Sequence, residues 1–254
     1  MPCGNDDGVV RSCTHPNGHP VTFSETLDSA EPRQPIARTW SCILFDLDGT
    51  ITDSAPGIIH RLALTLEEMG APVPTQAELL RWVGPPILDS FRDFAGFTPE
   101  QSLAALDVYR RLVAEVGPYN ESAVYPGMAG LVERLHGLGI PLAVSSSKPE
   151  SQVVPILEHF GLASFFTVIC GASDDETRSA KADVVAEALR RLHELGVDTS
   201  RTVLVGDRIH DVEGAAAHGI PAIVVEWGYG SPAEAGDAMA VVHSTDQLAS
   251  LLVG

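Results

Sequence analysis

Two aspartates separated by a single residue are the first candidates for chemistry. Asp46 and Asp48 lie in the segment Phe45-Asp46-Leu47-Asp48-Gly49-Thr50, directly after the apolar run Ile43-Leu44. Because a chain that leaves its strand at Gly49 can direct both carboxylates to one point, the pair indicates metal binding and covalent chemistry. An aspartate is a competent nucleophile toward phosphorus, and a second carboxyl group can deliver and remove a proton. A solvated turn is the alternative, since acidic residues and glycine are common in turns.

A run of three serines is a candidate phosphate site. The segment Ser145-Ser146-Ser147-Lys148-Pro149 comes directly after the apolar run Leu142-Ala143-Val144. Hydroxyls and free backbone amides at a strand end that leads into a helix can hold phosphate oxygens, with help from the positive end of the helix dipole. Routine capping of a helix by serine explains the same run as well.

Lys181 opens a long amphipathic segment after Gly171-Ala172-Ser173-Asp174-Asp175. A lysine in the first turn of a helix opposes the helix dipole. Another task is therefore indicated for it, such as binding a phosphoryl group and the carboxylate of the nucleophile. Taken alone, a lysine is more often simply exposed at the surface.

Two acids four residues apart form a candidate metal site. Asp207 and Asp211 follow the apolar run Val203-Leu204-Val205 and Gly206. Magnesium is commonly bound by one or two carboxylates together with water and substrate oxygens, which suits this pair. A helix cap would explain one of the two acids, but not both of them beside a strand-end glycine.

The elements that must position these segments are short apolar runs that alternate with amphipathic stretches after Trp40. The stretch 184–195, for example, repeats its apolar residues with the 3.6-residue period of a helix. Apolar strands separated by helices favour a parallel sheet covered on both faces. We therefore predict an α/β fold with a doubly wound, Rossmann-like parallel sheet. The predicted strands are 42–45, 141–145, 166–170, 202–205, 222–225 and a weaker one at 240–242.

Between residues 56 and 126 the sequence contains helical patterns and no convincing strand. Inserted after the first strand, this region would lie over the carboxyl ends of the sheet, where open α/β folds place their ligands. We therefore predict a helical cap at 56–126, with hinges at Gly57 and Tyr125-Pro126-Gly127. The helical patterns span 58–69, 77–83, 87–94 and 100–116.

The remaining chain divides into a core and an extension. Residues 39–55 and 127–254 are predicted to form the α/β core. Residues 1–38 are rich in glycine, proline, serine, aspartate and histidine without periodicity, which predicts a disordered extension.

Composition limits the classes of function. Acidic residues outnumber basic residues by 34 to 16, and the formal net charge of −18 repels polyanions, so we expect no nucleic-acid partner. A small anionic substrate then needs a locally neutralised site, which a divalent metal and a buried lysine would provide. No apolar run is long enough to span a bilayer, and the chain starts without a signal-peptide pattern. We expect a soluble, cytoplasmic protein without a membrane partner.

The four cysteines show no metal-binding spacing. Cys3, Cys13, Cys42 and Cys170 contain no pair of the CxxC type, and reduced thiols of a cytosolic enzyme fit them best. Cys13, His15 and His19 could in principle hold zinc, but a fourth ligand is missing, and we do not expect a zinc site.

Taken together and in this order, the four polar segments resemble the four motifs of the haloacid dehalogenase superfamily of aspartate-nucleophile phosphatases. The resemblance extends from about residue 42 to residue 252, and the combination is far more specific than any one segment. The helical insert resembles the small cap of that family. Gly84-Pro85-Pro86, Tyr125-Pro126-Gly127 and the segment 206–211 resemble its 5'-nucleotidase-like branch, a neighbour of the phosphoglycolate phosphatases.

The resemblance implies a magnesium-dependent phosphomonoesterase that acts on a small phosphorylated metabolite, with a nucleoside 5'-monophosphate as the best candidate. A phosphoglycolate phosphatase and a sugar phosphomutase are alternatives within the family. A phospho-accepting regulatory module is an alternative of a different class, although Asp48, the insert and the Gly206-Asp207 pair argue against it. The resemblance leaves monomer and homodimer open.

The resemblance also assigns roles to individual residues. Asp46 would attack phosphorus, Asp48 would act as general acid and base, and Ser146 and Lys181 would hold the phosphoryl group. Ser146 is preferred over Ser145 because Ser146-Ser147-Lys148-Pro149 matches the family's Thr-Asn-Lys-Pro. The implied magnesium ligands are Asp46, the backbone carbonyl of Asp48, Asp207, and Asp211 directly or through water. Further phosphate or substrate contacts are predicted at Gly49, Thr50, Ser147, Lys148 and, in the cap, Arg81 and Gly84.

Overall fold

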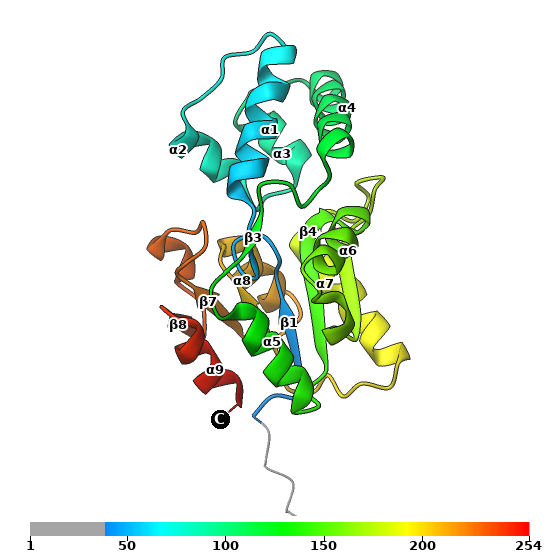
Figure 1. Ribbon diagram of the computed structural model, residues 1–254, viewed down its shortest axis with the longest axis vertical. Helices are drawn as coiled ribbons and strands as arrows, with labels where there is room; N and C mark the ends of the chain where they lie inside the picture. Colours follow the sequence, from blue (N-terminus) through cyan, green and yellow to red (C-terminus); the bar gives the residue numbers. More distant parts are fainter. Residues whose placement is uncertain (1–38, 254) are drawn as a thin grey trace, which may run out of the picture. The chain divides into compact units, whose positions relative to one another are not determined.

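A six-stranded parallel sheet forms the centre of the structure (Figure 1), a computed structural model that describes residues 39–253. The strand order is β5-β4-β1-β6-β7-β8, and every pair of neighbours runs parallel. This order confirms the predicted doubly wound α/β fold. The strands are β1 (Cys42–Phe45), β4 (Leu142–Pro149), β5 (Val168–Ala172), β6 (Thr202–Gly206), β7 (Ala222–Val225) and β8 (Ala240–Val242).

Alternate residues of the strands face opposite layers of helices. In β1, Ile43 and Phe45 pack in the cluster of α5, α6 and α9, whereas Cys42 and Leu44 pack in the cluster of α7 and α8. All four side chains are fully buried, which explains why the strand reads as one continuous apolar run. The helices are α5 (Met128–Gly137), α6 (Glu150–His159), α7 (Lys181–Glu194), α8 (Ile209–Ala216) and α9 (Thr245–Val253).

Four helices between β2 (Thr52–Asp53) and β3 (Ala123–Val124) build a separate apolar cluster, and they gather away from the sheet in Figure 1. Thr75 and Thr98 each cap a helix, with their side-chain oxygens accepting hydrogen bonds from backbone amides three residues later, as strong helix starts require. The helices are α1 (Ala55–Glu68), α2 (Gln76–Leu79), α3 (Ile87–Asp93) and α4 (Pro99–Val116), with a 3₁₀ turn at Leu80–Trp82. We refer to residues 56–126 as the cap; its boundaries stay a prediction.

The expectation that this region contains no strand is wrong. Thr52–Asp53 (β2) pairs antiparallel with Ala123–Val124 (β3), so a two-stranded ribbon carries the chain into and out of the helical insert. Gly57, predicted as a hinge, lies inside α1, where a side chain would collide with the carbonyl oxygen of Asn120. Strands of two residues have no room for an alternating pattern, so the sequence gives no sign of them.

The arrangement of three strands positions the predicted site. Because β1 lies between β4 and β6, the residues that follow these strands meet at one edge of the sheet. Asp46 follows β1 and Asp207 follows β6, while β4 itself continues through the serines to Pro149, with an irregular register after Ser146. The predicted strand 141–145 was therefore too short at its carboxyl end.

Several predictions concern residues outside the described part of the chain. These are the extension at 1–38 and the residues Cys3, Cys13, His15 and His19 within it. Cys42 and Cys170 are buried free thiols. Within residues 39–253, none of the helices combines the length and the apolar character needed to cross a bilayer.

Candidate active site

Lys181 joins two of the predicted acids. Its Nζ lies 2.7 Å from Asp46 Oδ1 and 2.7 Å from Asp211 Oδ1, and it donates a hydrogen bond of 3.0 Å to the carbonyl oxygen of Ser145. Lys181 is the first residue of α7, which packs on β4, β5 and α8. All three charged side chains are almost completely buried. The surface explanation for this lysine is therefore wrong, and α7 places it between the segments that follow β1 and β6.

Asp207 completes a group of three buried carboxylates. Ligand atoms of Asp46, Asp207 and Asp211 all lie within 4.8 Å of one another. Asp207 Oδ2 accepts a 2.6 Å hydrogen bond from the backbone amide of Tyr229, whereas Asp207 Oδ1 is buried without a hydrogen-bond partner among the described residues. Lys181 is paired with Asp46 and Asp211 but not with Asp207, so the group of three carboxylates keeps excess negative charge. An orphaned carboxylate oxygen and uncompensated charge fit a hard divalent cation such as Mg²⁺.

The electrostatics of the group follow from burial. Removal from water raises the pKa of Asp46 to about 6, against the lowering effect of Lys181, and Asp211 raises it further. The pKa of Asp207 is raised well above its usual range by burial and by the neighbouring carboxylates Asp211 and Asp46. Burial lowers the pKa of Lys181, but Asp211 and Asp46 outweigh it and hold the value above the usual range. The two carboxylates therefore favour the charged form of Lys181.

Gly49 allows the chain to pass beside Asp207. It has a φ of 87°, which is the left-handed region, and a β-carbon at this position would lie 2.3 Å from Asp207 Oδ2. Only glycine combines that backbone angle with that approach. Its predicted role as a phosphate contact stays a prediction, whereas its role in the turn follows from the geometry.

Asp48 faces a different set of partners from Asp46. Its Oδ2 lies 2.7 Å from Lys148 Nζ, and its Oδ1 accepts a 2.5 Å hydrogen bond from Ser54 Oγ. The Asp48 carboxylate thus lies outside the group of three acids, as its predicted proton-transfer role requires. The chain contains only two lysines, Lys148 and Lys181. The side chain of each is less than a tenth exposed, and each pairs with one acid of the first segment.

The three serines take different positions. Ser146 and Ser147 line the same pocket as Asp46 and Asp48, and Ser147 Oγ has no hydrogen-bond partner among the described residues. Ser145 is fully buried and offers its carbonyl oxygen to Lys181. This placement favours Ser146 over Ser145 as the residue that contacts a phosphoryl group.

The pocket lies between the acidic residues and the cap. From the cap it is lined by Ile58, the segment 82–85, Ile87, Leu106, Tyr109 and Arg110. Gly84 is in that lining, as predicted. The structure does not bring Arg81 or Thr50 to it: Arg81 is exposed and lies over the ring of Phe94, and Thr50 is fully buried outside the lining.

Three contacting residues were missed from the sequence. Tyr229 holds Asp207 through its amide, and its hydroxyl accepts hydrogen bonds from the amides of Ser54 and Ala55 at 2.7 and 3.0 Å. Ser54 holds Asp48, and Arg208 donates to the carbonyl oxygen of Val83 in the cap. The one available signal was position: Gly228-Tyr229-Gly230 follows β7 and so reaches the same edge of the sheet.

Comparison with known proteins agrees with this geometry. The family model described as haloacid dehalogenase-like hydrolase matches residues 43–225. A tyrosine-protein kinase, PtkA of Mycobacterium tuberculosis, is 43% identical over 189 residues, which are 74% of this chain but only 62% of the kinase. A 5'-nucleotidase of Pseudomonas aeruginosa is 35% identical over 76% of this chain and 85% of its own length. The crystal structure of a predicted phosphatase from Clostridium acetobutylicum superposes with a TM-score of 0.78 at 36% identity, covering 84% of this chain and 97% of that one.

Proposed function

We propose that this chain, which belongs to the haloacid dehalogenase-like hydrolase family, is a magnesium-dependent phosphomonoesterase that works through an aspartyl-phosphate. Family membership and the similarity to a 5'-nucleotidase and to a predicted phosphatase support phosphatase activity. The metal, the roles of the individual residues and the substrate are likewise part of the proposal.

In the first step, a carboxylate oxygen of Asp46 attacks the phosphorus of the bound ester, and the bond from phosphorus to the ester oxygen breaks. Asp48 donates a proton to the departing oxygen, which leaves as an alcohol. Lys181, 2.7 Å from Asp46 Oδ1, holds the nucleophile in place and compensates negative charge on the phosphoryl oxygens. Ser146 and Ser147 at the end of β4 supply hydroxyls to the same oxygens.

In the second step, water hydrolyses the aspartyl-phosphate. Asp48, now ionised, removes a proton from the water as the water attacks phosphorus. The bond from phosphorus to Asp46 breaks, and inorganic phosphate and the free carboxylate are restored. Lys148 and Ser54 keep Asp48 directed toward this point, so a single carboxyl group serves both proton transfers.

Mg²⁺, held by Asp46, Asp207, Asp211 and the backbone carbonyl of Asp48, would supply the positive charge that a dianionic phosphate needs before a carboxylate can approach it. The residues contribute positioning and charge compensation, which dominate the rate gain in phosphoryl transfer.

The observation that carries the proposal is the ion pair of Lys181 with Asp46 inside the group of three acids. A buried nucleophile beside a fixed cation and a set of hard oxygen ligands is an arrangement for phosphoryl transfer rather than for stability, because burying this much unbalanced charge is unfavourable.

The test is phosphate release by the purified protein, with MgCl₂ and with EDTA, across nucleoside monophosphates, phosphoglycolate and sugar phosphates. Asp46→Asn should lower kcat by about four orders of magnitude or more and leave the fold intact, while the exposed Asp107→Asn serves as the carboxylate control. Near-normal activity of Asp46→Asn would refute the assignment of Asp46 as the nucleophile. Conversion of a sugar phosphate without phosphate release would indicate a mutase, and a stable phosphorylated protein without turnover would indicate a regulatory module.

Among substrates we propose a nucleoside 5'-monophosphate, supported by the similarity to the 5'-nucleotidase over most of both chains. Comparison of kcat/KM among the nucleoside monophosphates, phosphoglycolate and the sugar phosphates tests this choice of substrate. A phosphoglycolate preference would overturn the substrate proposal and leave the hydrolase proposal unaffected.

The similarity to a tyrosine-protein kinase favours a second candidate function. In it, the phosphoryl group on Asp46 would come from the γ-phosphate of ATP and pass to a tyrosine hydroxyl instead of water. Incubation with ATP and a tyrosine-containing peptide tests this possibility by mass spectrometry. A phosphopeptide that forms with the wild type and not with Asp46→Asn would establish transferase activity.

A further inference from the structure

Each cationic side chain among the described residues that line the pocket is already paired with an acid. Among the described residues that line it, the only lysine or arginine side chains are Lys148 and Arg110. Lys148 is paired with Asp48 at 2.7 Å. Arg110, which reaches down from α4 of the cap, is paired with Glu176 Oε1 at 2.7 Å and donates a 2.8 Å hydrogen bond to the carbonyl oxygen of Asp174. A ligand anion above the phosphoryl group would therefore have to displace an existing partner.

Glu176 adds a negative charge to the pocket lining. Its side chain is only 13% exposed, and it is the sole acid in that lining other than Asp46 and Asp48. Its backbone adopts a φ of 61°, a left-handed conformation that costs a residue with a β-carbon roughly 1 to 2 kcal/mol. The Glu176 carboxylate therefore lines the pocket from a strained backbone conformation, which glycine would adopt more easily.

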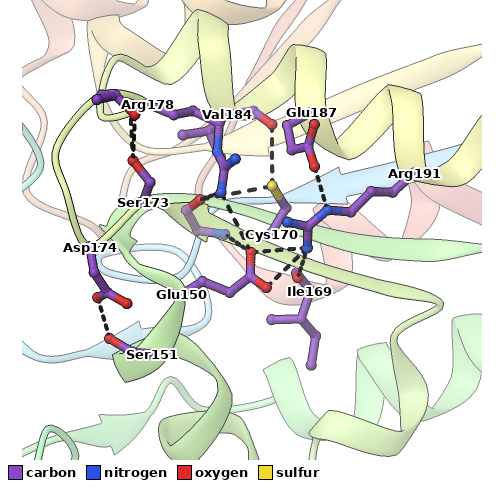
Figure 2. A network of polar contacts seen from close by, with 12 residues as sticks. Glu150, Ser151, Ile169, Cys170, Ser173, Asp174, Arg178, Val184, Glu187 and Arg191 are labelled. Atoms are coloured by element: carbon purple, nitrogen blue, oxygen red, sulfur yellow. Dashed lines mark hydrogen bonds and ion pairs between the residues drawn. The ribbon is translucent and has the colours of Figure 1, made fainter.

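The loop that carries Glu176 is held in place by the core. Ser151 of α6 donates a 2.6 Å hydrogen bond to Asp174, and the Arg178 amide donates to Ser173 Oγ (Figure 2). In the same network Arg178 lies near Glu150, which pairs with Arg191 at 3.0 Å. Because both ends of the loop are fixed, Glu176 cannot easily move away to accommodate an anion.

The cap side of the pocket is apolar. Ile58, Leu106 and Tyr109 line it and are each less than a tenth exposed, and Trp82 joins them from the 3₁₀ turn. Two of these four are aromatic, and Trp82 itself packs against Phe91 and Phe94 within the cap. The four side chains therefore form an apolar wall, which favours an apolar face of a ligand over a flexible polar chain. Apart from Arg110, the cap contributes no charged side chain to this lining.

We infer that the leaving group of the substrate is uncharged and presents an apolar face, such as that of an aromatic or heteroaromatic ring, and that esters with a second anionic group are rejected. The inference rests on the proposed phosphatase function and narrows it. A nucleoside or an aryl alcohol satisfies the apolar wall and demands no cation. A phosphorylated carboxylic acid would place its carboxylate near Glu176, and a like charge at such close range is strongly unfavourable.

The experiment compares kcat/KM for three esters in the presence of MgCl₂: phenyl phosphate, phosphoglycolate and glycerol phosphate, which has an uncharged leaving group without a ring. We expect phenyl phosphate to exceed phosphoglycolate by at least about a hundredfold, with glycerol phosphate between them. A higher value for phosphoglycolate than for phenyl phosphate would overturn the inference.

Glu176→Gln tests whether the charge of Glu176 causes the discrimination against phosphoglycolate. The amide keeps the shape of the side chain and can still accept a hydrogen bond from Arg110, but it leaves the arginine charge uncompensated. We expect the ratio of phenyl phosphate to phosphoglycolate to fall at least about tenfold, through a lower KM for phosphoglycolate. The control is Glu115→Gln, which removes a glutamate–arginine pair with Arg111 on the exposed face of α4, the helix that carries Arg110. An unchanged ratio in Glu176→Gln would overturn the inference.

These measurements distinguish a wrong phosphatase assignment from a wrong leaving group. If no ester is hydrolysed in an Asp46-dependent way, the proposed function itself is wrong. If hydrolysis depends on Asp46 but the ratio is reversed or insensitive to Glu176, only the inference about the leaving group is wrong. Arg110→Gln provides a second variant, since it should depress phosphoglycolate turnover further by leaving Glu176 unpaired.

Discussion

Arg208, next to the candidate metal ligand Asp207, donates a hydrogen bond from its guanidinium to the backbone carbonyl oxygen of Val83 in the cap, 125 positions away in the sequence. The same side chain is paired with Glu234 Oε2 at 2.8 Å, so its direction is fixed from the core. Arg208 is almost completely buried. The Arg208 side chain therefore connects two segments: the loop that carries Asp207 and the cap segment that lines the pocket.

Replacement of Arg208 by glutamine should increase the mobility of the cap segment 82–87 that lines the pocket. A hydrogen bond from a charged donor contributes about 1.5 to 3 kcal/mol, so its loss should speed amide exchange in peptides covering residues 82–87 by about tenfold or more. KM should rise more than kcat falls, because the change affects closure over the substrate rather than the reacting atoms. Hydrogen exchange and steady-state kinetics measure the two effects.

The control for this variant is Arg190→Gln on the exposed face of α7, where the arginine pairs with Glu187 and Glu194. Surface pairs of this kind contribute little, so exchange at 82–87 should remain unchanged. If Arg208→Gln leaves exchange at 82–87 as slow as in the wild type, the contact does not hold the cap segment.

Gly84→Ala should disturb the same junction from the cap side. Gly84 has a φ of 111°, and a β-carbon there would lie 3.1 Å from Arg208 Nη1 and 3.2 Å from its Cγ. The variant therefore suffers backbone strain and also crowds the arginine, and we expect a loss of about 1 to 3 kcal/mol of unfolding free energy together with a raised KM. Denaturant unfolding and kinetics provide both numbers.

Gly96→Ala separates the two effects. Gly96 is also left-handed, with a φ of 68°, but a β-carbon there would meet nothing within 4 Å. It should therefore show a modest loss of stability and an unchanged KM. Equal effects of both variants on KM would show that the approach of Gly84 to Arg208 is irrelevant to substrate binding.

Stability and metal binding should be linked to pH through the buried acids. Burial raises the pKa of Asp46 to about 6 in the folded protein from an ordinary value of 3.8. Its contribution to the stability of the metal-free protein is therefore fully present below the ordinary value and is lost as pH rises through about 6. A divalent cation competes with the proton for the same oxygens, so the stabilisation by Mg²⁺ should be small at pH 5 and large at pH 7.5.

Thermal unfolding in EDTA and in MgCl₂ across this range measures the linkage. Asp46→Asn has no such titration, so the difference between its melting temperature and that of the wild type should grow in favour of the variant as pH rises in EDTA. A Mg²⁺-induced shift that is the same at pH 5 and pH 7.5 would contradict the linkage.

The sequence was sufficient to predict the α/β core and the convergence of the four polar segments at one edge of the sheet. Fully buried parallel strands such as β1 must be apolar along their whole length, and polar residues directly after them must emerge at one edge. Lys181 and Asp207 were recognisable because their residue types are unfavourable for a helix start and a buried strand end unless they have a task.

The parts that could not be predicted depend on contacts between distant segments. The pairing of Thr52–Asp53 with Ala123–Val124 is too short to leave a pattern. Tyr229 acts on Asp207 through its backbone amide, which any residue possesses, so its identity gives no signal. Arg81 was the arginine predicted to contact the substrate, but the structure places it over Phe94, and Arg110 lines the pocket instead.

The position of Lys181 depends on a residue that has no side chain. Gly214 in α8 faces this lysine, and a β-carbon at position 214 would lie 2.5 Å from Lys181 Cγ and 3.0 Å from its Cβ. Gly214→Ala should therefore displace the side chain of Lys181 and lengthen its contacts with Asp46 and Asp211. Because a misplaced charge acts on the reacting atoms, we expect kcat to fall by about a hundredfold while the far-ultraviolet circular dichroism stays native. Gly130→Ala in α5, where a β-carbon meets nothing within 4 Å, is the matched helical control and should raise stability by about 0.5 to 1 kcal/mol without changing kcat. A Gly214→Ala variant as active as Gly130→Ala would show that the exact placement of Lys181 is not required for turnover.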